Sequence, residues 1–296
     1  MISSYPSVYS LGHKAVRDLF AEEVLIEEKI DGSQFSFGRL NGEIICRSKG
    51  VSVYTENPGM FDKAVETVER LAAHLPEGYV YRTEYLRAPK HNILAYARIP
   101  TNHLIVFDID RGGEDYVPYP EKCTMANALG LETVNRLVYG IIGNLEELHS
   151  LLERESGLGG TRIEGMVIKN YARYGVDKKV LMAKWVREEF KERLNKEWKA
   201  TNKPDVLALI VQALRTEARR AKAVQHLREA GEIEDSPRDI GKLIREVQKD
   251  VVQEEMEWIK DKLYERHIKD ILRGTSAGVA EWYKEQLAKK QFEEKS

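Results

Sequence analysis

The sequence has few cysteines and no long apolar run among its 296 residues. Its two cysteines, Cys46 and Cys123, form no CxxC pair, and the seven histidines are not clustered with them. This argues against a disulfide framework and a structural zinc site, so we expect any metal to use oxygen ligands. No apolar stretch approaches the ~20 residues that cross a membrane, and the first residues lack the segments of a secretory signal. We therefore expect a cytoplasmic protein that does not insert into membranes.

An excess of one charge is also missing, since 46 basic and 48 acidic residues give a net charge of −2. Proteins that coat nucleic acid usually show a clear basic excess. Contact with nucleic acid would therefore depend on local groups of basic residues. The length is sufficient for about two domains that each bury their own core.

The first two-thirds of the chain predicts strands that alternate with helices. Residues 23–40 and 43–48 are expected to be extended, and Asn41-Gly42 between them favours a type I′ hairpin turn. Apolar residues at helical spacing predict a helix within 59–75, and Asn144 with Glu147 resembles a capping box. Further strands are predicted where β-branched and aromatic residues gather, at 79–86, 103–109, 163–170 and 180–186.

From about residue 187 the pattern changes to almost continuous helix. Ser236-Pro237 resembles a capped helix start, with proline at the first helical position. We predict a compact α-helical C-terminal domain over 191–296, after a domain over 1–190. Its aromatic residues are interpreted as core rather than as stacking platforms: Trp198, Trp258, Tyr264, Trp282 and Tyr283.

One tetrapeptide, Lys29-Ile30-Asp31-Gly32, places a lysine in an apolar and otherwise acidic strand. An extended chain puts Lys29 and Asp31 on the same face. Lysine is a nucleophile only when deprotonated, so burial, nearby cations or a metal-bound phosphate must overcome its pKa of about 10.4. A surface lysine in a salt bridge is the alternative interpretation of this tetrapeptide alone.

Other segments follow in order on predicted strands: CRSKG (46–50), YRTEYL (81–86), VFDI (106–109), EGMVIK (164–169) and, less well matched, MAKWV (182–186). Together with KxDG they resemble the motifs of the covalent nucleotidyltransferase superfamily, which contains DNA ligases, RNA ligases and mRNA capping enzymes. The resemblance implies an α+β fold, with an antiparallel-sheet, ATP-grasp-like nucleotidyltransferase domain. The motifs cover roughly residues 20–190.

The resemblance also implies roles for individual residues. Lys29 would attack the α-phosphate of ATP and carry AMP, and Glu164 would help to hold Mg²⁺ or Mn²⁺. Glu84 would bind the ribose, Phe107 would stack on adenine and Arg47, on the strand paired with that of Lys29, would contact a phosphate. A cross-strand ion pair for Arg47 and core packing for Phe107 are the alternatives. The remaining nucleotide-binding residues that the motifs imply are Glu28, Asp31, Gln34, Lys169 and Lys184.

Two positions depart from the family pattern. Many relatives carry lysine where this chain has Met182, so Lys178 or Lys179 would have to compensate. Many RNA ligases of the nick-sealing RNA ligase 2 family, which this layout resembles, have histidine at the position of Asp31. Asp is common in the wider superfamily, so this departure bears on the subfamily and leaves the chemistry intact.

The helical tail favours RNA ligases, because DNA ligases and capping enzymes continue with a β-barrel OB domain. We therefore expect an ATP-dependent RNA ligase that joins 3′-hydroxyl and 5′-phosphate ends of RNA, or of DNA or hybrid strands, in RNA repair. The tail would help to bind the RNA or the adenylylated end. The alternatives are a DNA ligase, a guanylyltransferase-like enzyme, and a catalytically silent nucleic-acid-binding module.

Overall fold

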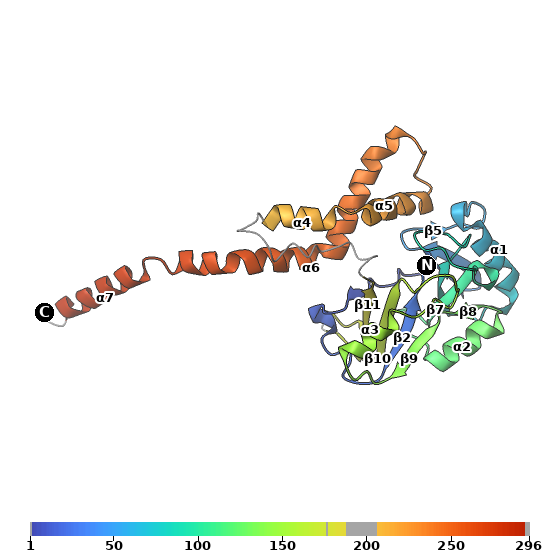
Figure 1. Cartoon of the computed structure of the whole chain (residues 1–296), viewed down its shortest axis with the longest axis horizontal. Coiled ribbons are helices and arrows are strands. Elements are labelled where there is room, and N and C mark those ends of the chain that lie inside the picture. Colours follow the sequence, from blue (N-terminus) through green and yellow to red (C-terminus); the bar gives the residue numbers. More distant parts are fainter. Residues whose placement is uncertain (1, 176, 188–205, 294–296) are drawn as a thin grey trace.

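The computed structural model describes residues 2–175, 177–187 and 206–293. Two β-sheets, here called sheet A and sheet B, occupy the first 186 residues, and helices make up most of the described chain after residue 205 (Figure 1). The predicted α+β architecture with a helical C-terminal part is confirmed. The predicted boundary between residues 190 and 191 lies outside the described residues.

Sheet A joins the two ends of the first domain. Its strand order is β1 (Tyr9–Ser10), β11 (Val180–Val186), β10 (Gly165–Tyr174), β2 (Val24–Lys29) and β9 (Arg136–Gly140). Only β1 and β11 pair in parallel, and the other neighbours are antiparallel. Three segments that are far apart in the sequence, β2, β10 and β11, therefore lie side by side.

Sheet B is built mainly from consecutive strands. Its order is β5 (Ser52–Val53), β4 (Glu43–Ser48), β3 (Ser33–Leu40), β6 (Val80–Tyr85), β7 (Leu104–Asp110) and β8 (Glu132–Thr133). The β3–β4 hairpin turns at Asn41 and Gly42, whose φ angles of 55° and 80° are those of the predicted type I′ turn.

Helices cover the outer, apolar faces of the two sheets. They are η1 (Lys14–Val16), η2 (Gly59–Phe61), α1 (Asp62–Leu71), η3 (Ala72–His74), η4 (Thr101–His103), α2 (Tyr119–Ala128) and α3 (Leu145–Leu151). On sheet B, Phe35 stacks on Phe61 and Phe37 on Tyr81. Each such buried ring contributes roughly 1.5–3 kcal/mol. On sheet A, the helix α3 starts at the predicted cap, where the Asn144 side chain accepts from the Glu147 N–H.

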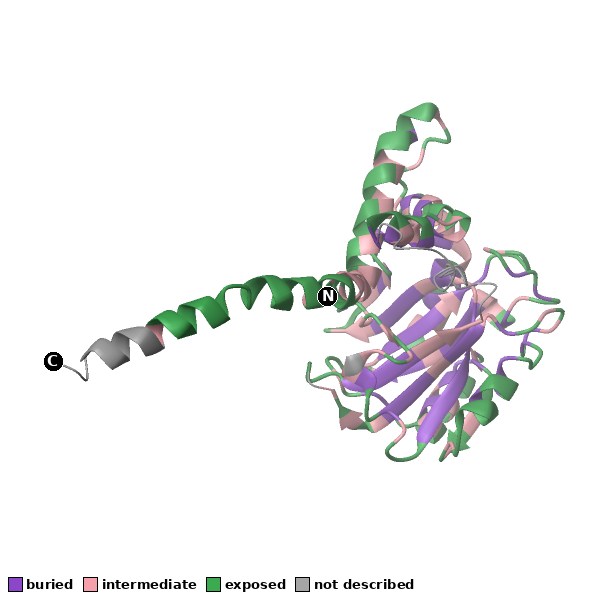
Figure 2. Ribbon diagram, turned by 60° about the vertical axis from the view of Figure 1, so that its left-hand side comes forward, coloured by how far each residue is buried: buried purple, intermediate pink, exposed green. Residues whose placement is uncertain are grey.

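The C-terminal part contains α4 (Val206–Leu214), α5 (Glu217–Glu229), η6 (Pro237–Asp239), α6 (Ile240–Thr275) and α7 (Val279–Glu293). The predicted capped start at Ser236 is present, and Asp239 completes a capping box with it. Helices α4 and α5 pack against α6, and α5 lies above the sheets (Figure 1). In the second half of α6 and in residues 279–286 of α7, no residue is buried and most are exposed (Figure 2).

Two predictions about the extent of the elements and the packing of the helical part are wrong. Residues 23–40 form no single strand, because the chain leaves sheet A after Lys29 and enters sheet B at Ser33. The helical part is not compact throughout, since Tyr264, Trp282 and Tyr283 are exposed on α6 and α7 rather than buried in a core. Helical periodicity predicts which residues share a face, but not whether another element covers that face. Trp258 is half-buried, and Trp198 lies outside the described residues.

Candidate active site between the two sheets

The inner faces of the two sheets are polar and turn toward each other. In the ladder of sheet A, Lys29 lies opposite Gly165, and Val167, two residues further along β10, lies opposite Lys184. Directly opposite residues share a face and alternate residues return to it, so Lys29 and Lys184 project from the same side. The apolar side chains of Ile26 and Ile168 point to the other face and enter the core under α3.

Lys29 and Glu164 form the centre of this interface. Lys29 is the last residue of β2 and Glu164 immediately precedes β10, and the Lys29 Nζ lies 2.6 Å from Glu164 Oε2. Burial lowers the pKa of Lys29, but the carboxylates of Glu164, Glu84 and Asp31 outweigh it and raise that pKa above its ordinary value. The nucleophile predicted from the sequence is therefore held as an ammonium ion against the predicted metal ligand.

Gly165 explains how β10 and β11 approach each other beside this pair. A Cβ atom at Gly165 would lie 2.4 Å from the carbonyl oxygen of Trp185 and 2.7 Å from the Cα of Val186. Only glycine fits there without displacing the backbone of β11. The Glu-Gly pair of the EGMVIK segment thus combines a carboxylate with the close strand contact that positions it.

Glu84 of β6 faces the same interface from sheet B. Its Oε2 atom is buried and has no hydrogen-bond partner among the described residues. Burial, together with Glu164, Glu229 and Asp31, raises the pKa of Glu84 to about 8, although Lys29 acts in the opposite direction. A buried acceptor without a partner is costly, so this atom is poised to bind a donor such as a ribose hydroxyl.

Asp31 does not share a strand face with Lys29, contrary to the sequence prediction, because β2 has already ended. Its Oδ2 atom accepts from the backbone N–H groups of Ile93 and Leu94, at 2.8 and 2.7 Å, and its own N–H donates to the Tyr96 hydroxyl. Asp31 therefore ties the loop after β6 to the segment that carries the nucleophile.

Glu28 precedes Lys29 and Gln34 follows it in the sequence, and the two side chains have different surroundings. The Glu28 carboxylate accepts from the Ser156 hydroxyl at 2.5 Å and from the Gly157 N–H at 2.9 Å. It thus fixes the loop before β10. Gln34 is half-buried and lies opposite Glu84 in the β3–β6 ladder, so these two residues share the inner face of sheet B.

We expected Arg47 on the strand that pairs with the Lys29 strand, and this prediction is wrong. Arg47 lies on β4 in sheet B, which pairs with β3 rather than with β2. It lies opposite Ser36 of β3, and its Nη1 donates to the carbonyl oxygen of Ile2 at 2.7 Å. Its Nε donates to the carbonyl oxygen of Ser48. The N-terminal segment therefore holds this guanidinium in the described structure.

Phe107 is half-buried at the irregularity of β7, in the apolar cluster that includes Ile30, Leu86 and Leu158. The ring of Tyr5 meets it edge-on at 5.1 Å between centroids. Core packing, which was the alternative for Phe107, is thus present, and stacking of this ring on adenine stays a prediction.

Lys169 belongs to a buried ion cluster that also contains Glu27, Asp108 and Lys122. Its Nζ lies 2.8 Å from Glu27 and 3.1 Å from Asp108, and Lys122 lies 2.6 Å from the other Glu27 oxygen. Both ammonium groups also donate to the carbonyl oxygen of Phe107. The sequence analysis did not select Glu27 or Lys122 as site residues. Glu27 could have been found from its position two residues before Lys29, because alternate residues of a strand share a face.

The segment that carries these residues matches a known protein family. A family model described as RNA ligase matches residues 22–186, which is more than half of the sequence. The chain belongs to the RNA ligase family. The matched residues include every site residue that the motifs implied.

Two solved RNA ligase structures resemble this chain. A lysine-to-alanine variant of Naegleria gruberi RNA ligase, with ATP and Mn, is 14% identical with a TM-score of 0.50, over 64% of this chain and 57% of that one. An archaeal ATP-dependent RNA ligase is 17% identical with a TM-score of 0.46, over 88% of this chain and 66% of that one. The likeness to the Naegleria enzyme shows a shared fold, and this chain spans less than two-thirds of either protein's length. No curated protein matches the sequence.

Lys184 connects this RNA ligase domain to the helical part, because its Nζ lies 2.9 Å from Glu254 of α6. Met182, which stands where many relatives have lysine, is buried and its sulfur accepts from the Tyr5 hydroxyl at 3.1 Å. Lys178 and Lys179 are exposed in the β10–β11 turn, at the opposite end of the hairpin from Gly165. Lys169, directly opposite Met182 in the ladder, places a buried ammonium group beside it instead.

The chain's residues fit a divalent ion carried by nucleotide phosphates. Within residues 2–175, 177–187 and 206–293, no group of three or more His, Cys, Asp or Glu side chains is arranged to hold a metal ion. Magnesium keeps several waters and needs only one or two protein carboxylates, and Glu164 can supply one.

The described helices include none that is long and apolar enough to span a membrane.

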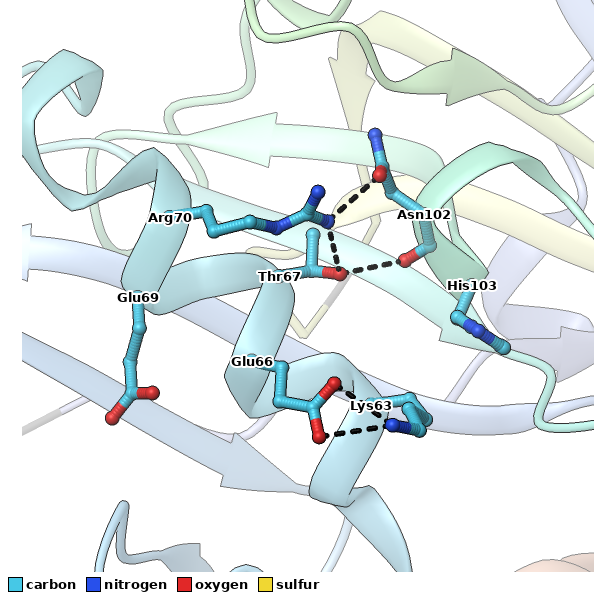
Figure 3. A pocket seen from close by; sticks show the side chains of 7 residues that line it. All are labelled: Lys63, Glu66, Thr67, Glu69, Arg70, Asn102 and His103. Atoms are coloured by element: carbon cyan, nitrogen blue, oxygen red, sulfur yellow. Dashed lines mark hydrogen bonds and ion pairs between the residues drawn. The ribbon is translucent and has the colours of Figure 1, made fainter.

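An open depression of about 810 Å³ lies away from these residues, on α1 and the turn before β7 (Figure 3). Figure 3 shows Arg70 and Thr67 bonded to Asn102 across it, and Lys63 paired with Glu66. Five of its seven lining residues are thus bonded to one another. None of its lining residues is a predicted site residue, so we place the chemistry between the sheets.

Proposed function

We propose that this protein is an ATP-dependent RNA ligase that joins 5′-phosphate and 3′-hydroxyl ends through a lysyl-AMP intermediate on Lys29. The observation that carries the proposal is the contact between Lys29 and Glu164 inside a polar interface that also holds the unpartnered Glu84 oxygen. Membership of the RNA ligase family supports the same activity. The complexes of the Naegleria enzyme with ATP and Mn support ATP and a divalent ion as its requirements.

The first step needs Lys29 as a free amine. Glu164, 2.6 Å away, raises the pKa of Lys29, so the proton leaves to solvent more readily once Glu164 exchanges the ammonium group for another partner. The Lys29 nitrogen then attacks the α-phosphorus of ATP. A nitrogen–phosphorus bond forms as the bond to the bridging oxygen breaks, and pyrophosphate leaves with that electron pair.

The protein contributes alignment and charge to this step. Glu84 would accept a ribose hydroxyl, and Lys184 would face the phosphates from the strand face that it shares with Lys29. When bound at Glu164, Mg²⁺ or Mn²⁺ supplies positive charge to the α-phosphate. Asp31 and Glu28 act indirectly, because their carboxylates hold the loops on either side of the nucleophile.

The second and third steps involve RNA. An oxygen of an RNA 5′-phosphate displaces the Lys29 nitrogen from AMP, and a 3′-hydroxyl then attacks the activated phosphorus and releases AMP. We propose that the N-terminal domain, residues 1–190, carries out the nucleotide chemistry. The helical domain, residues 191–296, would bind the RNA or the adenylylated end.

The test is incubation with α-³²P-labelled ATP and magnesium, followed by a denaturing gel. We expect label on the wild-type protein and on Lys63→Ala, a matched surface lysine on α1, and none on Lys29→Ala. The label should be released by acid, as a phosphoramidate is. Absence of label on folded wild-type protein would contradict the proposal and favour the silent binding module.

Substrate choice needs separate arms. Labelled GTP in place of ATP distinguishes a guanylyltransferase-like enzyme. Nicked or single-stranded RNA, set against DNA ends of the same sequence, distinguishes an RNA ligase from a DNA ligase. We expect sealed product from RNA with a 5′-phosphate, and none from RNA with a 5′-hydroxyl.

A further inference from the structure

Three lysines from three separate elements surround one carboxylate where the two domains meet. The Glu254 carboxylate of α6 lies 2.9 Å from Lys184 of β11, 3.7 Å from Lys49 after β4 and 4.0 Å from Lys222 of α5. Lys49 and Lys184 come from the sheet domain, whereas Lys222 and Glu254 come from the helical domain. The group is therefore complete only when the domains are together.

This cluster lies next to the reaction centre. Lys184 shares its strand face with Lys29, and Glu164 is close enough to both lysines for each to lower its pKa. Two ions, Lys184 and Glu164, thus stand between Glu254 and Lys29. A group that took the place of the Glu254 carboxylate would lie beside the phosphates of a bound nucleotide.

The three ammonium groups need an anion to stay together. The Lys49 side chain is 44% exposed, and partial desolvation together with repulsion from Lys222 and Lys184 lowers its pKa, although Glu254 acts in the opposite direction. Glu254 in turn is largely buried, and although burial alone would raise its pKa, the three lysines bring that pKa down to about 2. Glu254 is therefore fully ionised at neutral pH, and it is the one carboxylate within 4.0 Å of all three lysines among the described residues.

Neighbouring carboxylates are engaged elsewhere. Asp250 lies 2.5 Å from Lys222, but it also pairs with the buried Arg219, which bonds to Glu255 as well. Glu229 is close enough to Lys49 to be affected by its charge, but it bonds to Gln225. The pairs of Arg219 and Lys222 with Asp250 and Glu255 hold α5 on α6. Of these three α6 carboxylates, Glu254 is the one that is paired with lysines of the sheet domain.

We infer that Lys49, Lys184 and Lys222 form a phosphate-binding site shared by the two domains, and that Glu254 occupies it until a substrate phosphate displaces it. This inference rests on the proposed function. The ligand is an oxyanion with about two negative charges, which exceeds the single charge of the carboxylate. Two substrates of a ligase carry such a group: the pyrophosphate portion of ATP and the terminal phosphate of an RNA 5′-end.

Displacement of Glu254 has a structural consequence. The Glu254–Lys184 and Glu254–Lys49 pairs are contacts between the domains, and a phosphate that takes their place keeps the lysines paired while it releases α6. Lys222 then remains as the contribution of the helical domain to phosphate binding. The same exchange couples occupancy of the site to the position of the helical domain.

The experiment is isothermal titration of the full chain without ATP, with three probes: sodium pyrophosphate, a 5′-phosphorylated oligoribonucleotide and the same oligoribonucleotide with a 5′-hydroxyl. Neutralising the occupant in Glu254→Gln should tighten binding of a phosphorylated probe by about tenfold. Removing one cation in Lys222→Met should weaken it by a similar factor. The matched controls are Glu66→Gln and Lys63→Met, from an exposed ion pair on α1, and both should bind as the wild type does.

The probes identify the source of the phosphate. If the two substitutions change the affinity for pyrophosphate alone, the site belongs to the nucleotide. If they change the affinity for the 5′-phosphorylated oligoribonucleotide but not for its 5′-hydroxyl form, the site belongs to the RNA end. The inference is overturned if Glu254→Gln, shown by its thermal unfolding to be folded, binds both phosphorylated probes as tightly as the wild type. Because no probe requires lysyl-AMP formation, a chain that shows the expected pattern but takes no label from ATP would keep this site and lose the proposed function.

Discussion

The Nζ atom of Lys29 lies 2.6 Å from the Oε2 atom of Glu164, across the two strands β2 and β10 that the chain places side by side. The carboxylates around Lys29 outweigh the effect of burial and raise its pKa, which favours the ammonium form. We therefore expect Lys29 to react as an amine when Glu164 takes another partner.

Replacing Glu164 should therefore make Lys29 more reactive in the absence of ATP. In Glu164→Gln the loss of the closest carboxylate lowers the pKa of Lys29, so the free amine forms at lower pH. We expect its modification by an amine reagent, followed by peptide mass spectrometry from pH 7 to 11, to shift its midpoint downward by about one pH unit or more. The variant Glu66→Gln should leave the Lys29 profile unchanged, and an unchanged profile in Glu164→Gln would argue against this electrostatic hold.

Glu84 should make stability depend on pH. The folded protein keeps the Glu84 proton up to a pH of about 8, whereas the ordinary value is 4.5. The native state then binds more protons than the unfolded chain between these values, so its free energy of unfolding falls as pH rises from about 4.5 to 8 and levels off above. Glu84→Gln should raise the melting temperature by several degrees at pH 9 and leave it nearly unchanged at pH 5. Equal melting temperatures of the two proteins at pH 9 would refute the buried, raised state of Glu84.

Gly32 should not tolerate a side chain. A Cβ atom there would lie 2.9 Å from the Tyr85 carbonyl oxygen and 3.2 Å from Glu84 Oε2, which leaves no room beside the segment that links the sheets. We expect Gly32→Ala to lower the free energy of unfolding by about 1–3 kcal/mol and to reduce adenylylation strongly. Gly274→Ala on α6 is the control, since nothing lies within 4 Å of its added Cβ and alanine favours a helix. Equal effects of the two substitutions would show that the link is not tightly packed.

The buried ion cluster should be sensitive to the loss of one partner. Lys122 and Glu27 are both almost completely buried, and Lys122→Met leaves Glu27 paired with Lys169 alone. Breaking such a pair costs about 3–5 kcal/mol, and the double variant Lys122→Met with Glu27→Gln should recover part of that loss. Urea unfolding measures both, with Lys63→Met as the exposed control, expected within about 0.5 kcal/mol of the wild type. A double variant less stable than Lys122→Met would contradict the proposed pairing.

The strands that carry the motifs could be predicted from the sequence because each motif is a local pattern. The strands β6, β10 and β11 and the hairpin at Asn41 and Gly42 were anticipated from composition and turn residues. The helix α2 was missed, since it buries Lys122 as well as Ala126 and so lacks a clear apolar stripe. A buried lysine is satisfied by partners distant in the chain, and apolar periodicity does not report them.

The assignment of side chains to one sheet or the other could not be read from the sequence. Residues 23–40 look extended throughout, and only long-range pairing shows that the first strand joins β10 while the second joins β6. The expected pairing of the Arg47 strand with the Lys29 strand failed for this reason. Nor does local pattern indicate that Glu254 reaches Lys184, because the contact depends on how α6 docks.

The three residues between β2 and β3, Ile30 to Gly32, have a mechanical consequence. Three residues span at most about 10 Å, so this short linker cannot extend further when one sheet moves away from the other. Any sliding of one sheet past the other therefore displaces the peptide next to Lys29, the nucleophile that we propose. Added chain length is expected to be tolerated in the exposed turn at Asn41 and Gly42, whereas a single residue inserted after Ile30 would disconnect the position of the nucleophile from the spacing of the sheets.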